Sequence, residues 1–255
     1  MKEGRWGVCF LLLCCFALMG APYVPAQDSP STTSMATYYR CVQGDAARAD
    51  TIFKDHLGPF FNAEKAAGRI TSFGWAKHWS GGEWRRVFYM AGSDPDKLLD
   101  SYMGLIKMAQ SPEHAKAMDE FDRICSSHDD YTWRTKAGSQ PATGAARARS
   151  PFIMATYYVC NAQEAEADYI VKTFMAPVLN QRVKDHKIDA WVWNEHLMGG
   201  KYRRQLVVDG ANAKALLQHW STLQGELQKA NPDLSQRFTQ ICDSHSDYIW
   251  EIATQ

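Results

Sequence analysis

The sequence lacks an excess of charge of either sign, and this excludes several kinds of partner. Lys and Arg together number 28, Asp and Glu also number 28, and the formal net charge is zero. No basic run interleaved with aromatic residues occurs, so we expect no nucleic-acid partner, and the charge balance does not favour an anionic membrane. Hydrophobic residues form 45% of the chain, which is enough for a packed core and argues against disorder.

Motifs that identify a reaction are also missing. The chain contains no Ser-His-Asp signature, no phosphate-binding loop, no dinucleotide fingerprint and no paired-carboxylate motif. The sequence therefore leaves open whether the protein is an enzyme and which cofactor, if any, it uses.

Long hydrophobic runs are limited to one segment near the N-terminus. The stretch GVCFLLLCCFALMG follows Lys2 and Arg5, has the length of a signal-peptide core and is too short for a comfortable transmembrane span. Val24 and Ala26 occupy the positions expected before a cleavage site. We expect a signal peptide over residues 1–26, export to the periplasm or the exterior, and no stable membrane span after its removal. A retained anchor is the alternative.

What the chain does contain is an internal repeat. Three stretches recur after 117 to 119 residues, a drift that single-residue deletions explain. Offsets this regular indicate a tandem duplication. The recurring stretches are MATYYRCV at 35–42 and MATYYVCN at 154–161, WAKHWSGGEWRR at 75–86 and WNEHLMGGKYRR at 193–204, and ICSSHDDYTW at 124–133 and ICDSHSDYIW at 241–250.

The two copies span residues 35–135 and 152–252, and a linker rich in small residues, 136–150, joins them. In each copy a β-prone segment precedes a helical run, and two strands then flank a Gly-Gly turn. A second helical region, which in the first copy opens with Asp94 and Pro95, precedes the last strand. The order βαββαβ predicts an α+β fold of two tandem ferredoxin-like units.

Two such units in one chain resemble the dimeric α+β barrel superfamily. Its members include antibiotic-biosynthesis monooxygenases, muconolactone isomerases, chlorite dismutases and dye-decolourising peroxidases. The resemblance covers both repeats and rests on the order of the elements, without a family-specific motif. It implies that two ferredoxin-like sheets pack as a pseudo-dimeric α+β barrel within the chain. No catalytic residue is carried over from the family, and further oligomerisation is left open.

Four cysteines follow the expected signal peptide, and the topology suggests how they pair. With the strand order 4-1-3-2, the end of the first strand lies beside the start of the last strand. Cys41 and Cys160 lie at the ends of first strands, while Cys125 and Cys242 lie just before last strands. We therefore predict the disulfides Cys41–Cys125 and Cys160–Cys242, which an exported protein can form.

The repeated hairpin divides its side chains between two faces. A two-residue Gly-Gly turn would pair His78 with Arg85, and His196 with Arg203. Alternation then predicts that the apolar face lies under the helices. This face carries Phe73, Trp75, Trp79, Trp84, Arg86, Phe88 and Met90 in the first copy, and Trp191, Trp193, Leu197, Tyr202, Arg204, Leu206 and Val208 in the second.

The opposite face combines small residues with convergent polar groups, which offer room and hydrogen-bond donors for an anionic or oxygen-rich ligand. A guanidinium beside an imidazole should lower the imidazole pKa, so the two histidines would be neutral at pH 7 and able to accept a proton. The alternative is that these groups are solvated near the hairpin tip or bind the strands of the other copy. The ligand-binding candidates are His78, Arg85, Tyr89, His196, Arg203 and Gln205.

The remaining histidines suggest structural roles. His128 and His245 are expected to end the helix before the last strand, where an imidazole favours the helix dipole. Their rival roles are an acid–base pair with the Asp two residues later, or a zinc site with the nearby cysteines, and we predict no metal ligand. Four histidines without a counterpart in the other copy are expected at the surface or at the edge of the core: His56, His114, His186 and His219.

The leading interpretation is an exported small-molecule-binding protein of the α+β barrel type, with an unknown ligand in a cavity between the two sheets. One alternative is a cofactor-independent oxygenase or isomerase-like enzyme that uses His78 and His196 as bases. Another is a haem-binding protein, which would need a histidine facing a large apolar cavity. The last alternative is a structural or interaction protein that binds no ligand.

Overall fold

The computed structural model describes residues 31–139 and 150–254. The expected signal peptide and most of the expected linker lie outside these residues. The first repeat comprises β1 (Thr33–Arg40), α1 (Ala46–Ile52), η1 (Phe53–Leu57), α2 (Gly58–Ala66), β2 (Ser72–Gly81), β3 (Arg86–Gly92), α3 (Pro95–Ala109), α4 (Ala115–Ile124) and β4 (Ser127–Gly138). The second comprises β5 (Phe152–Val159), α5 (Glu164–Ile170), η2 (Val171–Met175), α6 (Ala176–Lys184), β6 (Ala190–Met198), β7 (Arg204–Gly210), α7 (Ala213–Ala230), α8 (Pro232–Ile241) and β8 (Ser244–Thr254).

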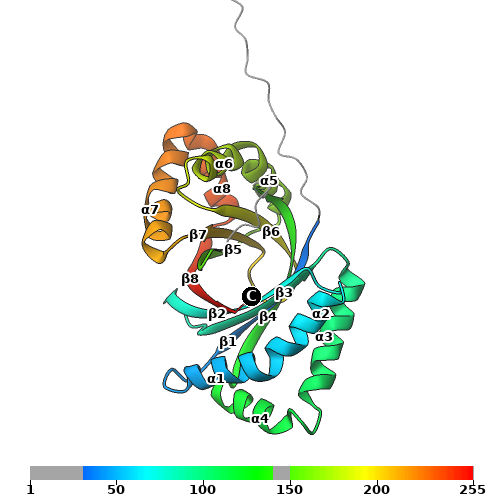
Figure 1. The fold of residues 1–255 in the computed structure, drawn as a ribbon. Helices are drawn as coiled ribbons and strands as arrows, with labels where there is room; N and C mark the ends of the chain where they lie inside the picture. Colours follow the sequence, from blue (N-terminus) through cyan, green and yellow to red (C-terminus); the bar gives the residue numbers. More distant parts are fainter. Residues whose placement is uncertain (1–30, 140–149, 255) are drawn as a thin grey trace, which may run out of the picture.

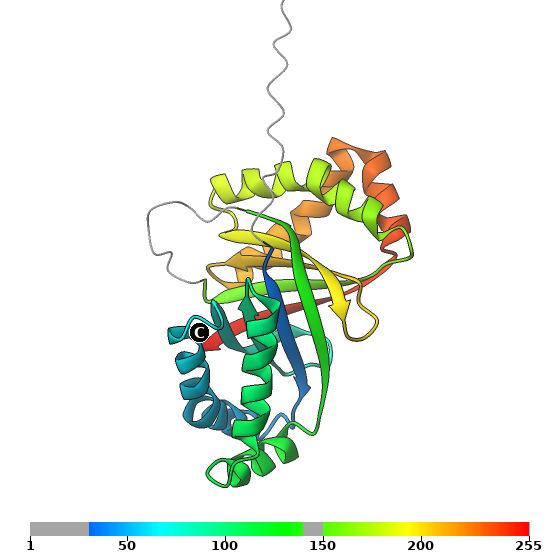
Figure 2. The same ribbon diagram turned by 90° about the vertical axis from the view of Figure 1, so that its right-hand side faces the viewer.

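The strands form one closed antiparallel barrel in the order β1-β3-β2-β8-β5-β7-β6-β4. Each repeat contributes four neighbouring strands in the predicted order, and the repeats meet at two seams, β2–β8 and β4–β6. Helices α1–α4 cover the sheet of the first repeat and α5–α8 cover that of the second, so the barrel lies between two helical layers (Figure 1; Figure 2). The predicted pseudo-dimeric α+β barrel is therefore confirmed.

The first helical region of each repeat widens into a π-helical turn, η1 or η2, at the same place. A proline follows each turn, Pro59 in α2 and Pro177 in α6. Proline has no N–H, and its ring clashes with the carbonyl four residues earlier, so a regular α-helix cannot continue through it. The wider turn accommodates the proline without breaking the helix axis.

A separate apolar core lies between the helices and the sheet of each repeat. In the first core Phe53 stacks on Trp75, and Phe61 stacks on Phe88. Most of the hairpin side chains predicted to face the helices do so. These are Phe73, Trp75, Phe88 and Met90 in the first repeat, and Trp191, Trp193, Leu206 and Val208 in the second.

Both predicted disulfides are present, Cys41–Cys125 and Cys160–Cys242. Each links the residue after the first strand of its repeat to the segment before the last strand, across 84 and 82 residues respectively. Loop closure of this length corresponds to about 4–5 kcal/mol of stabilisation in the chain-entropy model. None of the helices in the described parts of the chain is long and apolar enough to cross a membrane.

Candidate functional site

Aromatic rings pack inside the barrel. Neighbouring ring centroids lie as close as 4.3 Å, between Tyr38 and Trp84, which are stacked. These rings occupy the space between the two sheets, which is where the sequence predicted the ligand cavity. The buried aromatic residues of this cluster are Tyr38, Trp84, Tyr131, Trp133, Tyr157, Tyr202, Tyr248 and Trp250.

Trp84 and Tyr202 belong to this interior cluster and do not face the helices, so their predicted positions are wrong. Strands β3 and β7 begin two residues after them, so strand alternation does not extend to these side chains. Trp79 and Leu197, assigned to the same face, are 48% and 44% exposed near the hairpin tips. The tips therefore bend away from the regular pleat of the sheet.

The paired glycines of each hairpin allow close contact with the last strand of the other repeat. A Cβ on Gly81 would lie 2.4 Å from the carbonyl oxygen of Asp247, and one on Gly199 would lie 2.4 Å from that of Asp130. Both glycines also have positive φ angles, +130° and +132°, which L-residues rarely adopt. The repeated Gly-Gly is thus a contact between repeats as well as a turn.

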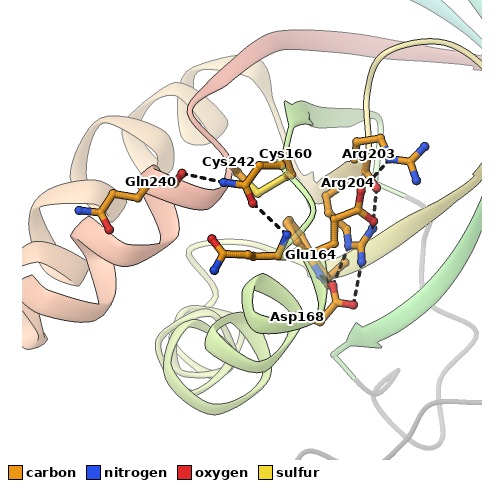
Figure 3. The surroundings of a disulfide bond; sticks show 10 residues. Cys160, Glu164, Asp168, Arg203, Arg204, Gln240 and Cys242 are labelled. Atoms are coloured by element: carbon orange, nitrogen blue, oxygen red, sulfur yellow. Dashed lines mark hydrogen bonds and ion pairs between the residues drawn. A yellow bond between two sulfur atoms is a disulfide. The ribbon is translucent and has the colours of Figure 1, made fainter.

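The second arginine of each hairpin is held in a buried structural triad. Arg204 donates two hydrogen bonds to the Asp168 carboxylate, at 2.7 and 3.0 Å, and the Trp193 indole donates a third at 2.8 Å. Figure 3 shows Asp168 reaching from α5 to Arg204 near the Cys160–Cys242 disulfide. The first repeat contains the same triad, formed by Arg86, Asp50 and Trp75.

The structure brings the predicted His–Arg pairs together beside the two seams. His196 Nδ1 lies 2.8 Å from a guanidinium nitrogen of Arg203, and His78 Nε2 lies 3.4 Å from one of Arg85. Burial, followed by the adjacent arginine, lowers the pKa of His78 and of His196, so both imidazoles are neutral at pH 7. His196 Nε2 is buried and has no hydrogen-bond partner among the described residues.

The other two predicted ligand residues lie with the barrel rings. Gln205 is buried, accepts a hydrogen bond from Asn194 at 2.9 Å and donates one to the Tyr38 hydroxyl at 3.3 Å. Tyr89 covers Gly74, where a Cβ would lie 2.4 Å from its ring. The predicted candidates therefore divide between the seams and the barrel interior, and their role in ligand binding stays a prediction.

A pocket of about 510 Å³ lies outside the barrel, in the helical layer of the second repeat between α7, α8 and η2. Around it Gln224, Gln228, Thr239, Asp243 and His245 provide exposed polar groups. An apolar cavity with a few polar groups is typical of small-molecule sites. Its apolar lining includes Ile170, Phe174, Met175, Trp220, Leu223 and Leu227.

The sequence patterns did not predict this pocket, although two residues contain a signal for it. Counting back from Cys125 and Cys242 places Met118 of the first repeat at the position of Ser235 in the second. Met118 packs against the first core, whereas the Ser235 hydroxyl is buried and finds no hydrogen-bond partner in the described parts of the chain. On α7, a Cβ on Gly225 would meet no atom of residues 31–139 or 150–254 within 4 Å. Ser235 of the second repeat therefore replaces the larger Met118 of the first, and Gly225 on α7 leaves open space beside the pocket.

His245, which lines the pocket, is the second residue of β8, and His128 is the second residue of β4. The prediction that they end a helix is wrong, because each preceding helix stops before its disulfide cysteine. The Nδ1 atoms of His245 and His128 lie 3.1 Å from the carboxylates of Asp247 and Asp130. The hydrogen bond to Asp247 raises the pKa of His245.

The histidines without counterparts differ in their surroundings. His219 is 3% exposed, so its predicted position at the surface or core edge is wrong. It lies on the core-facing side of α7, where Arg182 donates to its Nδ1 at 2.7 Å. His56 and His114 are half-buried and face each other across 3.1 Å, whereas His186 is exposed.

Comparisons with known proteins identify the fold and no closer relationship. No family model matches the sequence, and no curated protein matches it. Among solved structures, an anthrone oxidase-like protein has a TM-score of 0.57 and 9% identity, covering 91% of this chain and 95% of its own. A "putative monooxygenase" from Lactobacillus acidophilus has a TM-score of 0.53 and 12% identity, covering 88% and 97%. Another "putative monooxygenase", from Fusobacterium nucleatum, has a TM-score of 0.57 and 7% identity, covering 87% of this chain and 92% of its own.

These similarities support the α+β barrel and do not transfer an activity. At such low identity, unrelated functions share one fold, and a function has to be argued from the site. The chain thus has the fold of dimeric α+β barrel proteins, with both halves in one polypeptide.

Proposed function

We propose that the protein is an exported small-molecule-binding protein whose ligand occupies the pocket of the second repeat. The observation that carries this proposal is a pocket of about 510 Å³ with an apolar lining and polar groups around it. Its volume lies within the range usual for ligand sites. Export is supported by the two disulfides, which persist in oxidising compartments, and by the signal-like N-terminal sequence.

The first repeat serves as an internal reference for this pocket. There Met118 fills the position that Ser235 leaves open in the second repeat. The ligand should have an apolar body and at least one polar group that can reach the exposed polar side chains around the pocket.

Haem is a second candidate for the same pocket, because His245 is one of the lining residues. A carboxylate that holds Nδ1 of an imidazole, as Asp247 does here, orients Nε2 for metal ligation. In that case His245 would hold the haem iron, and the apolar side chains that line the pocket would contact the porphyrin. The iron would supply the redox chemistry that these side chains lack.

An enzyme that uses His78 and His196 as bases is the alternative at the seams. The lowered pKa of both imidazoles favours this alternative, because neutral imidazole can accept a proton. For any substrate that is found, the double variant His78→Ala/His196→Ala should lose turnover. Unchanged turnover would exclude both residues as bases.

A thermal-shift screen of the purified protein with small apolar acids, alcohols and aromatic compounds tests the pocket, and a haem titration followed in the visible region tests the second candidate. A ligand of the pocket should raise the melting temperature of the wild type and of Ser221→Met, which alters an exposed site on α7. It should not do so for Ser235→Met, which introduces the side chain found in the first repeat. Equal shifts in all three proteins would place binding elsewhere. A Soret band that keeps the position and shape of free haem throughout the titration would exclude haem.

A further inference from the structure

The first repeat contains a pair of histidines that its core does not require. His56 comes from the π-helical turn η1, and His114 directly precedes α4. Their Nδ1 atoms lie 3.1 Å apart, and the two rings are almost perpendicular, at 89°. Both side chains are half-buried, so their nitrogens face each other close to solvent.

The second repeat shows what folding alone places at these two positions. Phe174 is the fourth residue of η2, as His56 is of η1, and it packs against the second core. Asn231 corresponds to His114, counted from the disulfide cysteines, and its side chain caps α8 by accepting from the Leu234 N–H at 3.0 Å.

His114 provides no such cap, because its side chain forms no capping hydrogen bond with α4. Replacing a capping Asn by a residue that does not cap typically destabilises the helix. The first repeat thus lacks both a helix cap and an aromatic core contact at the two positions where its imidazoles meet. Helix stability and core packing do not explain this pair.

We propose that His56 and His114 form a binding site for a divalent transition-metal ion such as Zn²⁺. With Zn–N distances of about 2.0–2.1 Å, two nitrogens 3.1 Å apart subtend about 100° at the metal, which lies between octahedral and tetrahedral angles. Imidazole nitrogen suits Zn²⁺, Cu²⁺ and Ni²⁺. The described residues contain no group of three or more potential ligands, so water or a small exogenous ligand completes the coordination.

This site is independent of the pocket in the second repeat. The metal would join α4 to the π-helical turn of the long helical region, two elements that approach each other only in the folded state. Binding should therefore stabilise the fold, because a ligand of the native state alone shifts the unfolding equilibrium.

Titration calorimetry of tag-free protein with ZnCl₂, combined with thermal melts, tests the proposal. The variants His56→Phe and His114→Asn introduce the residues of the second repeat, and His186→Asn replaces an exposed histidine elsewhere. Wild type and His186→Asn should bind one equivalent of Zn²⁺ and melt at a higher temperature with it. Each site variant should bind at least tenfold more weakly, and His114→Asn without zinc should melt at or above the wild-type temperature.

Two results would overturn the proposal. One is the absence of one-equivalent Zn²⁺ binding to the wild type, or binding of equal strength in either site variant. The other is that both site variants melt below the wild type while zinc leaves the wild-type melting temperature unchanged. The pair would then be a structural hydrogen bond between two imidazoles.

Discussion

The two repeats keep the same frame and differ on their outer surfaces. Both contain the disulfide, the Gly-Gly hairpin against the opposite strand, and the Arg–Asp–Trp triad. On the outside, the second repeat opens a pocket beside Ser235, whereas the first fills that position with Met118 and pairs His56 with His114. The duplication has thus retained what closes the barrel and diverged where helices meet solvent.

Loss of a disulfide should have the largest effect, and it should be equal in the two repeats. The chain-entropy model predicts that Cys41→Ala/Cys125→Ala and Cys160→Ala/Cys242→Ala each lower the free energy of unfolding by about 4–5 kcal/mol, because the loops span 84 and 82 residues. Denaturant unfolding of both variants measures this. A difference of several kcal/mol between the unfolding free energies of the two variants would show that the disulfides do not stabilise the two repeats equally.

The seam glycines should come next in effect. Gly81→Ala and Gly199→Ala each force a Cβ against a carbonyl oxygen at a positive φ, so we expect each to destabilise the protein by about 3 kcal/mol. Gly44→Ala is the control, since a Cβ there meets no atom of the described residues within 4 Å. If Gly199→Ala is as stable as the control in chemical denaturation, the close contact at that seam does not exist.

A charge difference between the repeats should appear as pH dependence. At equivalent positions, the first repeat pairs buried Glu64 with Ser101, and the second pairs buried Arg182 with His219. Burial and then Arg182 lower the pKa of His219 to about 4, against about 6.5 in an unfolded chain. Between these values the unfolded state binds more protons, so stability falls as the pH drops from 6.5 toward 4.

This pH-dependent contribution of His219 amounts to up to about 3 kcal/mol. His219→Asn retains an acceptor for Arg182 without the titration, so its stability should decline less than that of the wild type between pH 7 and pH 4.5. Denaturant melts at several pH values measure the difference. Parallel pH profiles for the two proteins would contradict a buried neutral His219.

The smallest effect concerns the glycine beside the pocket. Gly225→Ala should raise the free energy of unfolding by about 0.5–1 kcal/mol, because alanine favours the helix and its Cβ would have no described neighbour within 4 Å. Thermal and denaturant melts of the ligand-free protein can detect this gain. A loss of stability would mean that α7 packs more tightly around Gly225 than its open surroundings indicate.

The frame was predictable because the sequence contains it twice. The recurrence of Cys41 and Cys125 as Cys160 and Cys242, together with the βαββαβ order, was sufficient for the topology and the disulfides. Pairing of the hairpin strands also followed, since the His78 N–H donates to the Arg85 carbonyl as the turn requires.

The pocket and the aromatic cluster inside the barrel could not be predicted from the repeat. Trp84 lies before its strand begins, so the two-residue period that orders strand side chains does not apply to it. The space beside Ser235 and Gly225 exists because the side chains of three helical segments do not fill the interface between them. Such a space becomes a cavity only after those segments have been placed.

The most direct test of the central claim is a fluorescence titration with anilinonaphthalene sulfonate, an apolar fluorophore with one sulfonate. It would compare the wild type with Ser235→Met and with the exposed-site control Ser221→Met. If the second repeat carries a ligand pocket that Ser235 keeps open, the wild type and the control should show one saturable site, and Ser235→Met should bind at least tenfold more weakly. Equal affinity in all three folded proteins would contradict the account.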